Sequence, residues 1–377
     1  MIVRKADIWH LKLAFLSPIK HNLATHQGSE NLVIKLTTAE GAAGYGEGVP
    51  RAFVTGETLA ASLAFLGEVL TPGFLQMPLA GPQELLGALA ARLEALPGAG
   101  AHPAACCALE MALLDAGART WARPLSDFLG PRLHDRLTYS AVLPLAPPEQ
   151  MARLFQLVKA NGMRFLKLKV GTDRDLDLLA RARADLGWDL DLRVDANCAW
   201  TAAEAIPRLK EMQRFRLSAV EQPVAKEDFE GLRQVQEALD LPVIADESLC
   251  SEADARRLLA LKACRIFNLR LSKCGGLLAA TRIRQMAQEA GVSCQLGCHV
   301  GETSILSAAG RHFGLSSPRL AYVEGSFSPF LLRRDPVAEP VAFSHGGAAA
   351  GLPGPGLGVE VLDTVLDELA VSRVLVE

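Results

Sequence analysis

The chain has 377 residues, more than one average domain, and a barrel of about 250 residues with a smaller second domain would account for it. Half of the residues are hydrophobic and 21% are charged, which is ordinary for a globular enzyme. The formal net charge is −3 and no long basic run is present, so we expect no nucleic-acid partner. No run of about 18 uncharged apolar residues occurs, so we expect no membrane partner either.

The compartment is inferred from the N-terminus and the cysteines. Residues 1–15 alternate like a strand and lack the apolar core and cleavage site of a signal peptide. The eight cysteines show no paired CxxC spacing. Both features favour a reducing cytoplasm with free thiols.

The first third of the chain reads as strands followed by helices. Residues 3–15 and 32–36 alternate as strands of an antiparallel sheet, and the glycine-rich residues 41–48 continue it. The polar segment 17–30 between the first two runs is expected to be a loop. Helical periodicity then covers residues 57–70, 82–96 and 103–119.

From about residue 136, short apolar runs alternate with helix-like stretches. The eight strand candidates are 137–143, 164–170, 191–197, 219–223, 242–248, 266–271, 293–299 and 322–325. This alternation, at intervals of roughly 25 residues, predicts an α/β fold with a parallel TIM-like barrel. We expect an α+β capping domain at 1–130, the catalytic barrel at 131–330, and a segment at 331–377 that returns to the cap.

Acidic residues fall at the C-terminal ends of three successive predicted strands. They are Asp195, Glu221 and Asp246, separated by 26 and 25 residues. Because the C-terminal ends of barrel strands form the active-site face, the three carboxylates should converge. Such a cluster needs a hard divalent cation, and Mg2+ suits it. Helix N-caps would explain one of these acids more easily than three.

Lysines bracket the acids. Lys167 and Lys169 are two residues apart on one predicted strand and therefore share a face, and Lys273 follows the sixth strand. If they point into the barrel mouth, Lys169 and Lys273 approach a substrate from opposite sides. Neighbouring cations lower the pKa of an ammonium group, which supplies a neutral amine as base near pH 7. An isolated lysine would more simply be a surface residue.

Several motifs carry a family resemblance that spans nearly the whole chain. They are KLK (167–169), DAN (195–197), EQP (221–223), ADES (245–248), NLRLSKCGG (268–276), GYGEGVP (44–50), ALEMALLDAGART (108–120) and GLGVEV (356–361). Together they resemble the muconate-lactonizing-enzyme subgroup of the enolase superfamily. The resemblance implies a cap over a (β/α)7β barrel, with Mg2+ on the three acids. It also implies Lys169 and Lys273 as acid/base residues, with Lys167 tuning Lys169.

The implied reaction is abstraction of the proton next to a substrate carboxylate, through an enediolate stabilised by the metal and the lysine charges. We expect a homo-oligomeric isomerase, either a racemase or epimerase or a cycloisomerase, acting on a small-molecule carboxylate. A lyase, such as an o-succinylbenzoate synthase or an acid-sugar dehydratase, could use the same proton abstraction. A non-catalytic relative would have no need of three acids and two lysines.

Substrate contacts are expected from Glu324, His299, Asn197 and Arg51. Dipeptide epimerases of the family carry Asp-x-Asp on the eighth strand, where this chain has one acid, Glu324, which makes a dipeptide substrate doubtful. Glu324 could equally be a structural acid. His299 is interpreted as a pocket or structural residue, with base as the alternative. His21 and His26, like Arg51, could bind a distal carboxylate, and Glu302 is expected to anchor a strand or the cap.

Overall fold

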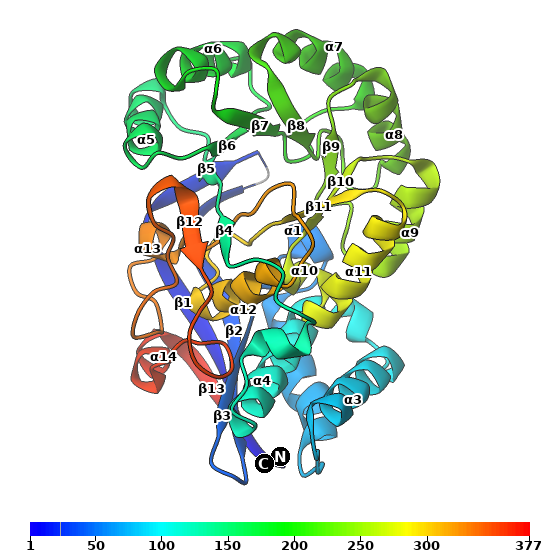
Figure 1. The fold of residues 1–377 in the computed structure, drawn as a ribbon, viewed down its shortest axis with the longest axis vertical. Coiled ribbons are helices and arrows are strands. Elements are labelled where there is room, and N and C mark those ends of the chain that lie inside the picture. The colour runs from blue at the N-terminus through cyan, green and yellow to red at the C-terminus, as the bar shows by residue number, and fades with distance from the viewer. Residues whose placement is uncertain (23) are drawn as a thin grey trace.

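The computed structural model describes residues 1–22 and 24–377 and has two parts (Figure 1). An antiparallel sheet of four strands, in the order β13-β1-β2-β3, forms the cap with its helices. A parallel sheet of seven strands, in the order β11-β10-β9-β8-β7-β6-β5, curls into the barrel. The α/β fold predicted from the sequence is therefore confirmed.

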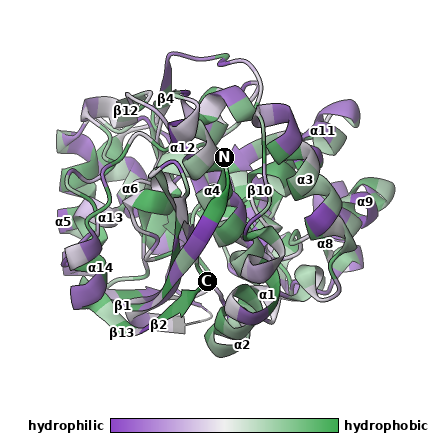
Figure 2. Ribbon diagram, turned by 90° about the horizontal axis from the view of Figure 1, so that it is seen from below, coloured by the Kyte–Doolittle hydropathy of each residue, from purple (hydrophilic) through white to green (hydrophobic). Residues whose placement is uncertain are grey.

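The barrel alternates strands and helices along the chain. Its strands are β5 (Ala141–Leu143), β6 (Phe165–Lys169), β7 (Asp191–Asp195), β8 (Leu217–Glu221), β9 (Val243–Ala245), β10 (Ile266–Leu269) and β11 (Ser293–Leu296). Its helices are α5 (Pro148–Ala160), α6 (Asp175–Leu186), α7 (Ala202–Met212), α8 (Phe229–Ala238), α9 (Glu252–Leu261), α10 (Leu271–Cys274), α11 (Leu277–Glu289) and α12 (Ser304–Leu315). Figure 2 shows hydrophilic and hydrophobic stretches on outer helices such as α8 and α9, as expected for helices with one face against the sheet.

The eighth barrel position is held by a short bridge instead of a full strand. Val323 pairs with Leu296 of β11, and the Val323 carbonyl accepts the Ser140 N–H at 2.8 Å beside β5. These contacts close the ring between β11 and β5. The predicted first strand, 137–143, is divided in two, because β4 (Arg136–Thr138) pairs with β12 (Ala348–Ala350) while β5 pairs with β6.

The cap begins with a long hairpin of β1 (Val3–His21) and β2 (Ala24–Thr38). The prediction of a loop at 17–30 is wrong for most of that range. The two strands pair with each other again from Ile19 opposite His26 to His21 opposite Ala24. The Lys20 carbonyl also accepts the Leu145 N–H, which ties the hairpin to the barrel. Strand β13 (Ala370–Val376) pairs with β1 and brings the two chain ends together (Figure 1).

Helix α4 (Pro103–Thr120) is buried along most of its length against β3 (Ala43–Gly48). Gly44, Gly46 and Gly48 share one face of β3, and a Cβ at each would lie 1.9–2.3 Å from a backbone atom of α4. Only glycine permits this approach, which explains the glycine-rich run in the sequence. The other cap helices are α1 (Ala52–Thr55), α2 (Leu59–Ala64) and α3 (Pro82–Ala95); α13 (Ser328–Leu331) and α14 (Asp363–Leu369) follow the barrel.

No helix in the described part of the chain is long and apolar enough to cross a membrane.

Candidate active site

The three strand-end acids lie on neighbouring strands at one end of the barrel. Asp195 ends β7 and Glu221 ends β8, and the two residues are paired in register. Asp246 directly follows β9, the next strand. All three side chains are fully buried. The strand periodicity thus brings the acids to adjacent places.

A cationic side chain is paired with each acid. Lys169 Nζ lies 2.6 Å from Asp195 Oδ2, and Lys167 Nζ lies 2.9 Å from Glu221 Oε2. Asp246 pairs with Arg270 and, at 2.8 Å, with Lys273 Nζ. Buried carboxylates are tolerated only when they are paired in this way.

Lys167 is a fixed cation within this network. Burial lowers its pKa, but Glu221, Glu324 and Asp195 together raise the pKa well above the ordinary value. Its Nζ also lies 3.4 Å from Asp195 Oδ2, the oxygen that Lys169 contacts. Lys167 therefore holds a positive charge next to Lys169.

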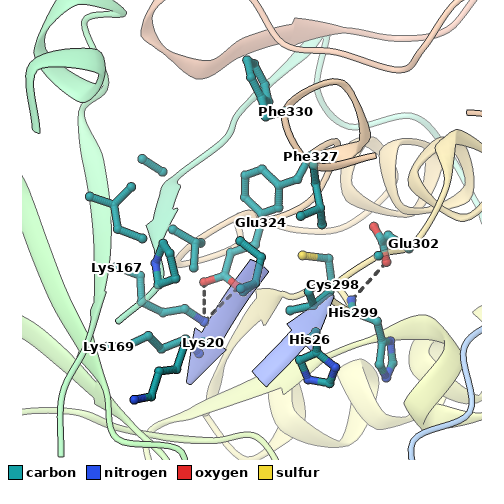
Figure 3. A pocket seen from close by; sticks show the side chains of 18 of the residues that line it. Lys20, His26, Lys167, Lys169, Cys298, His299, Glu302, Glu324, Phe327 and Phe330 are labelled. Carbon is teal, nitrogen blue, oxygen red and sulfur yellow. Dashed lines mark hydrogen bonds and ion pairs between the residues drawn. The ribbon is translucent and has the colours of Figure 1, made fainter. Parts of the chain in front are cut away.

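The two lysines expected as acid and base differ in exposure. Lys169 is 13% exposed and lines a cavity of about 350 Å3 at the barrel mouth (Figure 3). Lys273 is fully buried and does not line that cavity. Its Nζ donates to the Asp246 carbonyl at 2.6 Å, to Asp246 Oδ1 at 2.8 Å and to the Asn268 carbonyl at 3.0 Å. Lys169 ends β6, and Lys273 lies in α10 directly after β10, which is four places from β6 in the sheet.

Three charged residues of the site were not singled out from the sequence. Arg270 pairs with Asp246, Glu247 accepts a hydrogen bond from Asn197 Nδ2 at 3.0 Å, and Arg193 pairs with Glu324 at 2.6 Å. Arg193 stands two residues before Asp195 on the same strand, so the period of two could have found it. Glu247 and Arg270 follow strand ends, where a charged residue also faces the barrel mouth.

The strand-end acids are the candidate ligands for a metal ion. Within residues 1–22 and 24–377, no three His, Cys, Asp or Glu side chains converge as metal ligands, since each acid contacts a protein cation. The chemistry nevertheless fits a hard divalent cation, because carboxylate oxygens end three adjacent strands. Asn197 Oδ1 and Glu247 Oε2 are also buried without a hydrogen-bond partner, and a cation would satisfy them. The oxygen donors at these strand ends therefore fit Mg2+.

Glu324 lines the cavity, yet both of its oxygens are engaged. Arg193 donates to Oε1 at 2.6 Å, and Lys167 donates to Oε2 at 2.9 Å (Figure 3). The guanidinium of Arg193 also lies over the Tyr322 ring, 4.1 Å from its centroid. These contacts favour the structural interpretation of Glu324 over direct substrate contact.

His299, Asn197 and Arg51 also line the cavity. Burial and the positive charges of Arg270, Arg51 and Lys273 hold the pKa of His299 well below its ordinary value, so its ring is neutral, and Nδ1 has no hydrogen-bond partner. Arg51 is held by Ser29 Oγ at 2.6 Å and by the Pro50 and Val300 carbonyls, which engages it structurally.

The remaining expected residues are placed as follows. His26 lines the cavity beside Phe53, with ring centroids 6.1 Å apart, whereas the side chain of His21 lies outside the described part. Glu302 accepts the His299 N–H at 3.1 Å and a hydrogen bond from Ser307 at 3.1 Å, and so fixes the turn after β11.

Comparisons with known proteins identify the family of the chain. Residues 5–130 match the N-terminal domain of the mandelate racemase / muconate lactonizing enzyme family, and residues 150–365 match the enolase C-terminal domain-like family. An L-Lys-D/L-Arg epimerase of Methylococcus capsulatus is 35% identical over 88% of this chain and 91% of that protein. Its crystal structure with Mg and the dipeptide L-Arg-D-Lys superposes with a TM-score of 0.85 at 32% identity, covering 96% of this chain and all of that one.

Two further solved structures cover nearly all of the chain. The N-succinyl Arg/Lys racemase of Bacillus cereus has a TM-score of 0.92 at 28% identity and covers both chains completely. The muconate lactonizing enzyme of Pseudomonas fluorescens has a TM-score of 0.90 at 25% identity, covering 98% of this chain and 99% of that one. The chain therefore belongs to the mandelate racemase / muconate lactonizing enzyme group of the enolase superfamily. Its curated relatives are racemases and epimerases, and the chain is an isomerase of this superfamily.

Proposed function

We propose that this chain is a Mg2+-dependent racemase or epimerase that removes and returns the proton α to a substrate carboxylate. Asp195, Glu221 and Asp246 hold the metal in this proposal, and Lys169 and Lys273 serve as acid and base. The relatives named above act on dipeptides and on N-succinyl amino acids, which makes amino-acid derivatives with a free carboxylate the first compounds to test.

The observation that carries the proposal is the placement of Lys169. Its amine faces the cavity, contacts a strand-end acid at 2.6 Å, and shares that acid with the permanently charged Lys167. An amine that faces the cavity beside a strand-end acid is placed to exchange a proton with a bound carboxylate. Lys273 lies in α10, directly after β10, which is four places from β6 in the sheet.

The chain's own residues then perform the proton transfers. Lys169 Nζ takes the α-proton from one face, while Lys167 holds its positive charge beside Asp195 and Glu221. Lys273 Nζ delivers a proton to the other face after exchanging its bond to the Asn268 carbonyl for the substrate. Bound Mg2+ would supply electrostatic stabilisation of the negative charge that develops on the substrate carboxylate.

A screen in D2O tests the proposal. Carboxylic acid derivatives are incubated with the protein and Mg2+, and mass spectrometry detects deuterium at the α-carbon. Racemisation or epimerisation gives a gain of one mass unit with inversion, whereas a lyase would show loss of water. Absence of exchange from every compound would contradict proton abstraction.

All eight cysteines are free in the structure, in keeping with the proposed cytoplasmic location. The homo-oligomer and the domain limits at residues 130 and 330 stay predictions.

A further inference from the structure

The cavity beside Lys169 has two chemically different ends. We call the polar one the lysine end; its members are Lys167, Lys169, Asn197, Glu247 and Arg270. The other end, the apolar annex, is lined by helix α5, the turn after it, helix α13 and the segment before β12. Its members are Leu154, Leu157, Met163, Phe327, Phe330 and Phe343. Figure 3 shows Phe327 and Phe330 on the far side of the pocket from Lys169.

The rings of the annex hold one another in place. Phe343 lies 5.5 Å from Phe330, 6.3 Å from Phe327 and 5.5 Å from Tyr139, measured between ring centroids. These distances are those of favourable aromatic pairs. The annex is therefore a formed wall, whose shape exists before any ligand arrives.

The rim of the annex is left open to solvent. Phe330 is 61% exposed and Leu157 is 58% exposed, among the most exposed large apolar side chains of the described chain. Apolar side chains gathered around a cavity favour an occupant that removes them from water. The annex is thus suited to an apolar arm of a ligand whose carboxylate lies at the lysine end.

The charged side chains of the cavity argue against a ligand that carries an ammonium group. Among the described residues, three carboxyl groups line the cavity and none is available at the annex: Glu324 is engaged by Lys167 and Arg193, and Glu302 by the His299 N–H and Ser307. The third, Glu247, follows Asp246 at the lysine end.

Five cationic side chains line the same cavity among the described residues, and they outnumber the carboxyl groups. They are Lys20, Arg51, Lys167, Lys169 and Arg270. Among the described residues, a ligand ammonium group would find no free carboxylate near the annex, because the strand-end acids are already paired with Lys167, Lys169 and Arg270.

We infer that the substrate is a carboxylate whose α-substituent is uncharged and whose side arm is apolar, an aryl or branched alkyl group lodged in the annex. This inference rests on the proposed function, because it takes the lysine end as the place of the reacting carbon. It assigns Phe330, Leu157 and Leu154 as specificity-determining residues. An acylated amino acid with a large apolar side chain is the simplest compound of this class.

Matched compounds test the two halves of the inference. N-propionyl-L-phenylalanine and L-alanyl-L-phenylalanine differ only by an ammonium group, and N-propionyl-L-alanine lacks the arm. We expect kcat/KM for α-proton exchange in D2O with Mg2+ to be at least about tenfold higher for N-propionyl-L-phenylalanine than for either of the others. Equal or faster exchange of the dipeptide, or of the short-arm compound, would overturn the inference.

Binding separates this inference from the proposed function. The same compounds are titrated by calorimetry into the protein with Mg2+. Preferential binding of N-propionyl-L-phenylalanine without exchange would retain the substrate class and reject the proton transfer. Exchange of all compounds without a preference would retain the proton transfer and reject the substrate class. If the compounds neither bind nor exchange, both the proton transfer and the substrate class are rejected.

Variants locate the effect in the annex. Phe330→Ala should lower kcat/KM for the phenylalanine compound by about tenfold and leave that for N-propionyl-L-alanine within twofold. Leu157→Ser, at a second exposed position, should act in the same direction. Trp188→Ala is the matched control, since Trp188 is 49% exposed and does not line the cavity. An equal loss for both compounds in both annex variants would contradict the assignment.

Discussion

The lysine end and the apolar annex of the cavity differ in how their side chains are held. At the lysine end each cationic side chain is paired with a buried acid within 3 Å, as Lys169 is with Asp195 and Lys167 with Glu221. In the annex, half-buried rings pack edge and face and leave Phe330 on the rim. A substitution at the lysine end leaves a buried charge unpaired, whereas one in the annex changes contact area. In the function proposed above, the lysine end sets the reaction and the annex sets the substrate.

The largest loss of activity is expected from changes to the strand-end acids that pair with the cations of the lysine end. Chelation should abolish exchange and Mg2+ should restore it, and Asp246→Asn or Glu221→Gln should lower kcat by about 10³-fold, because charge stabilisation is lost. Asp135→Asn, at a fully exposed acid, is the control for the acid-to-amide change. Full activity in a sample verified to be free of metal would contradict the lysine end as a metal site.

Glu324 lies between the two ends of the cavity, and a substitution there distinguishes a structural role from contact with the substrate. Glu324→Gln removes the charge that neutralises Lys167 and Arg193, so the free energy of unfolding should fall by about 3–5 kcal/mol. Urea denaturation measures this loss. A variant with unchanged stability but altered substrate preference would return Glu324 to the substrate-contacting role first expected of it.

Two buried acids away from the cavity should make the free energy of unfolding depend on pH. Glu47 of β3 accepts N–H groups of Thr303 and Leu306 at the start of α12, and Glu110 of α4 accepts those that begin α11. Burial outweighs these hydrogen bonds and raises the pKa of each carboxyl from 4.5 to about 7. Both residues tie the cap to the barrel.

Because the pKa of each carboxyl group is raised in the folded protein, stability should decrease as pH rises. The folded protein binds these protons more tightly than the unfolded chain does, so the stabilisation is present below pH 4.5 and is lost as pH rises through about 7. Each acid should contribute up to about 3 kcal/mol to that slope. Glu47→Gln and Glu110→Gln should flatten the dependence of unfolding free energy on pH between 4.5 and 7. An unchanged slope in both variants would contradict the raised pKa values.

The smallest effect is expected at the tip of the β1–β2 hairpin. Asn22 Nδ2 donates to the Val170 carbonyl at 2.5 Å and to the Ala196 carbonyl at 2.7 Å, beside Lys169 and Asp195. Asn22→Ala should raise KM by about 3–10-fold with little change in kcat, because two hydrogen bonds that hold the hairpin over the lysine end are lost. Steady-state kinetics measures this, and a fall in kcat at constant KM would argue against a positioning role for Asn22.

The lysine end was largely predictable because the β/α repeat fixes where strands end. Spacings of about one repeat placed Asp195, Glu221 and Asp246 on neighbouring strands, and the period of two paired Lys167 with Lys169. Arg270 and Glu247 escaped notice because their roles depend on contacts with Asp246 and Asn197 across strands.

The annex could not be predicted in the same way. Phe330 lies in the four-residue helix α13 and Phe343 in irregular chain after the barrel, and Leu154 is one apolar residue among several on an amphipathic helix. These side chains come into contact because of the path that the segment after residue 325 takes across the barrel mouth. No local sequence pattern predicts that path. The hairpin at 17–30 was mistaken for a loop for a similar reason, since its polar strands are held by pairing and not by an apolar face.

The central claim is that two lysines act from opposite faces of one substrate, and exchange of separate enantiomers tests it most directly. Both enantiomers of an active compound are incubated in D2O with Lys169→Ala and with Lys273→Ala, and α-deuterium is followed by mass spectrometry. Each variant should lose exchange of one enantiomer by about 10²–10⁴-fold, with the lost enantiomer reversed between the two variants. Exchange of both enantiomers at the wild-type rate in the double variant would contradict the account and direct attention to His299.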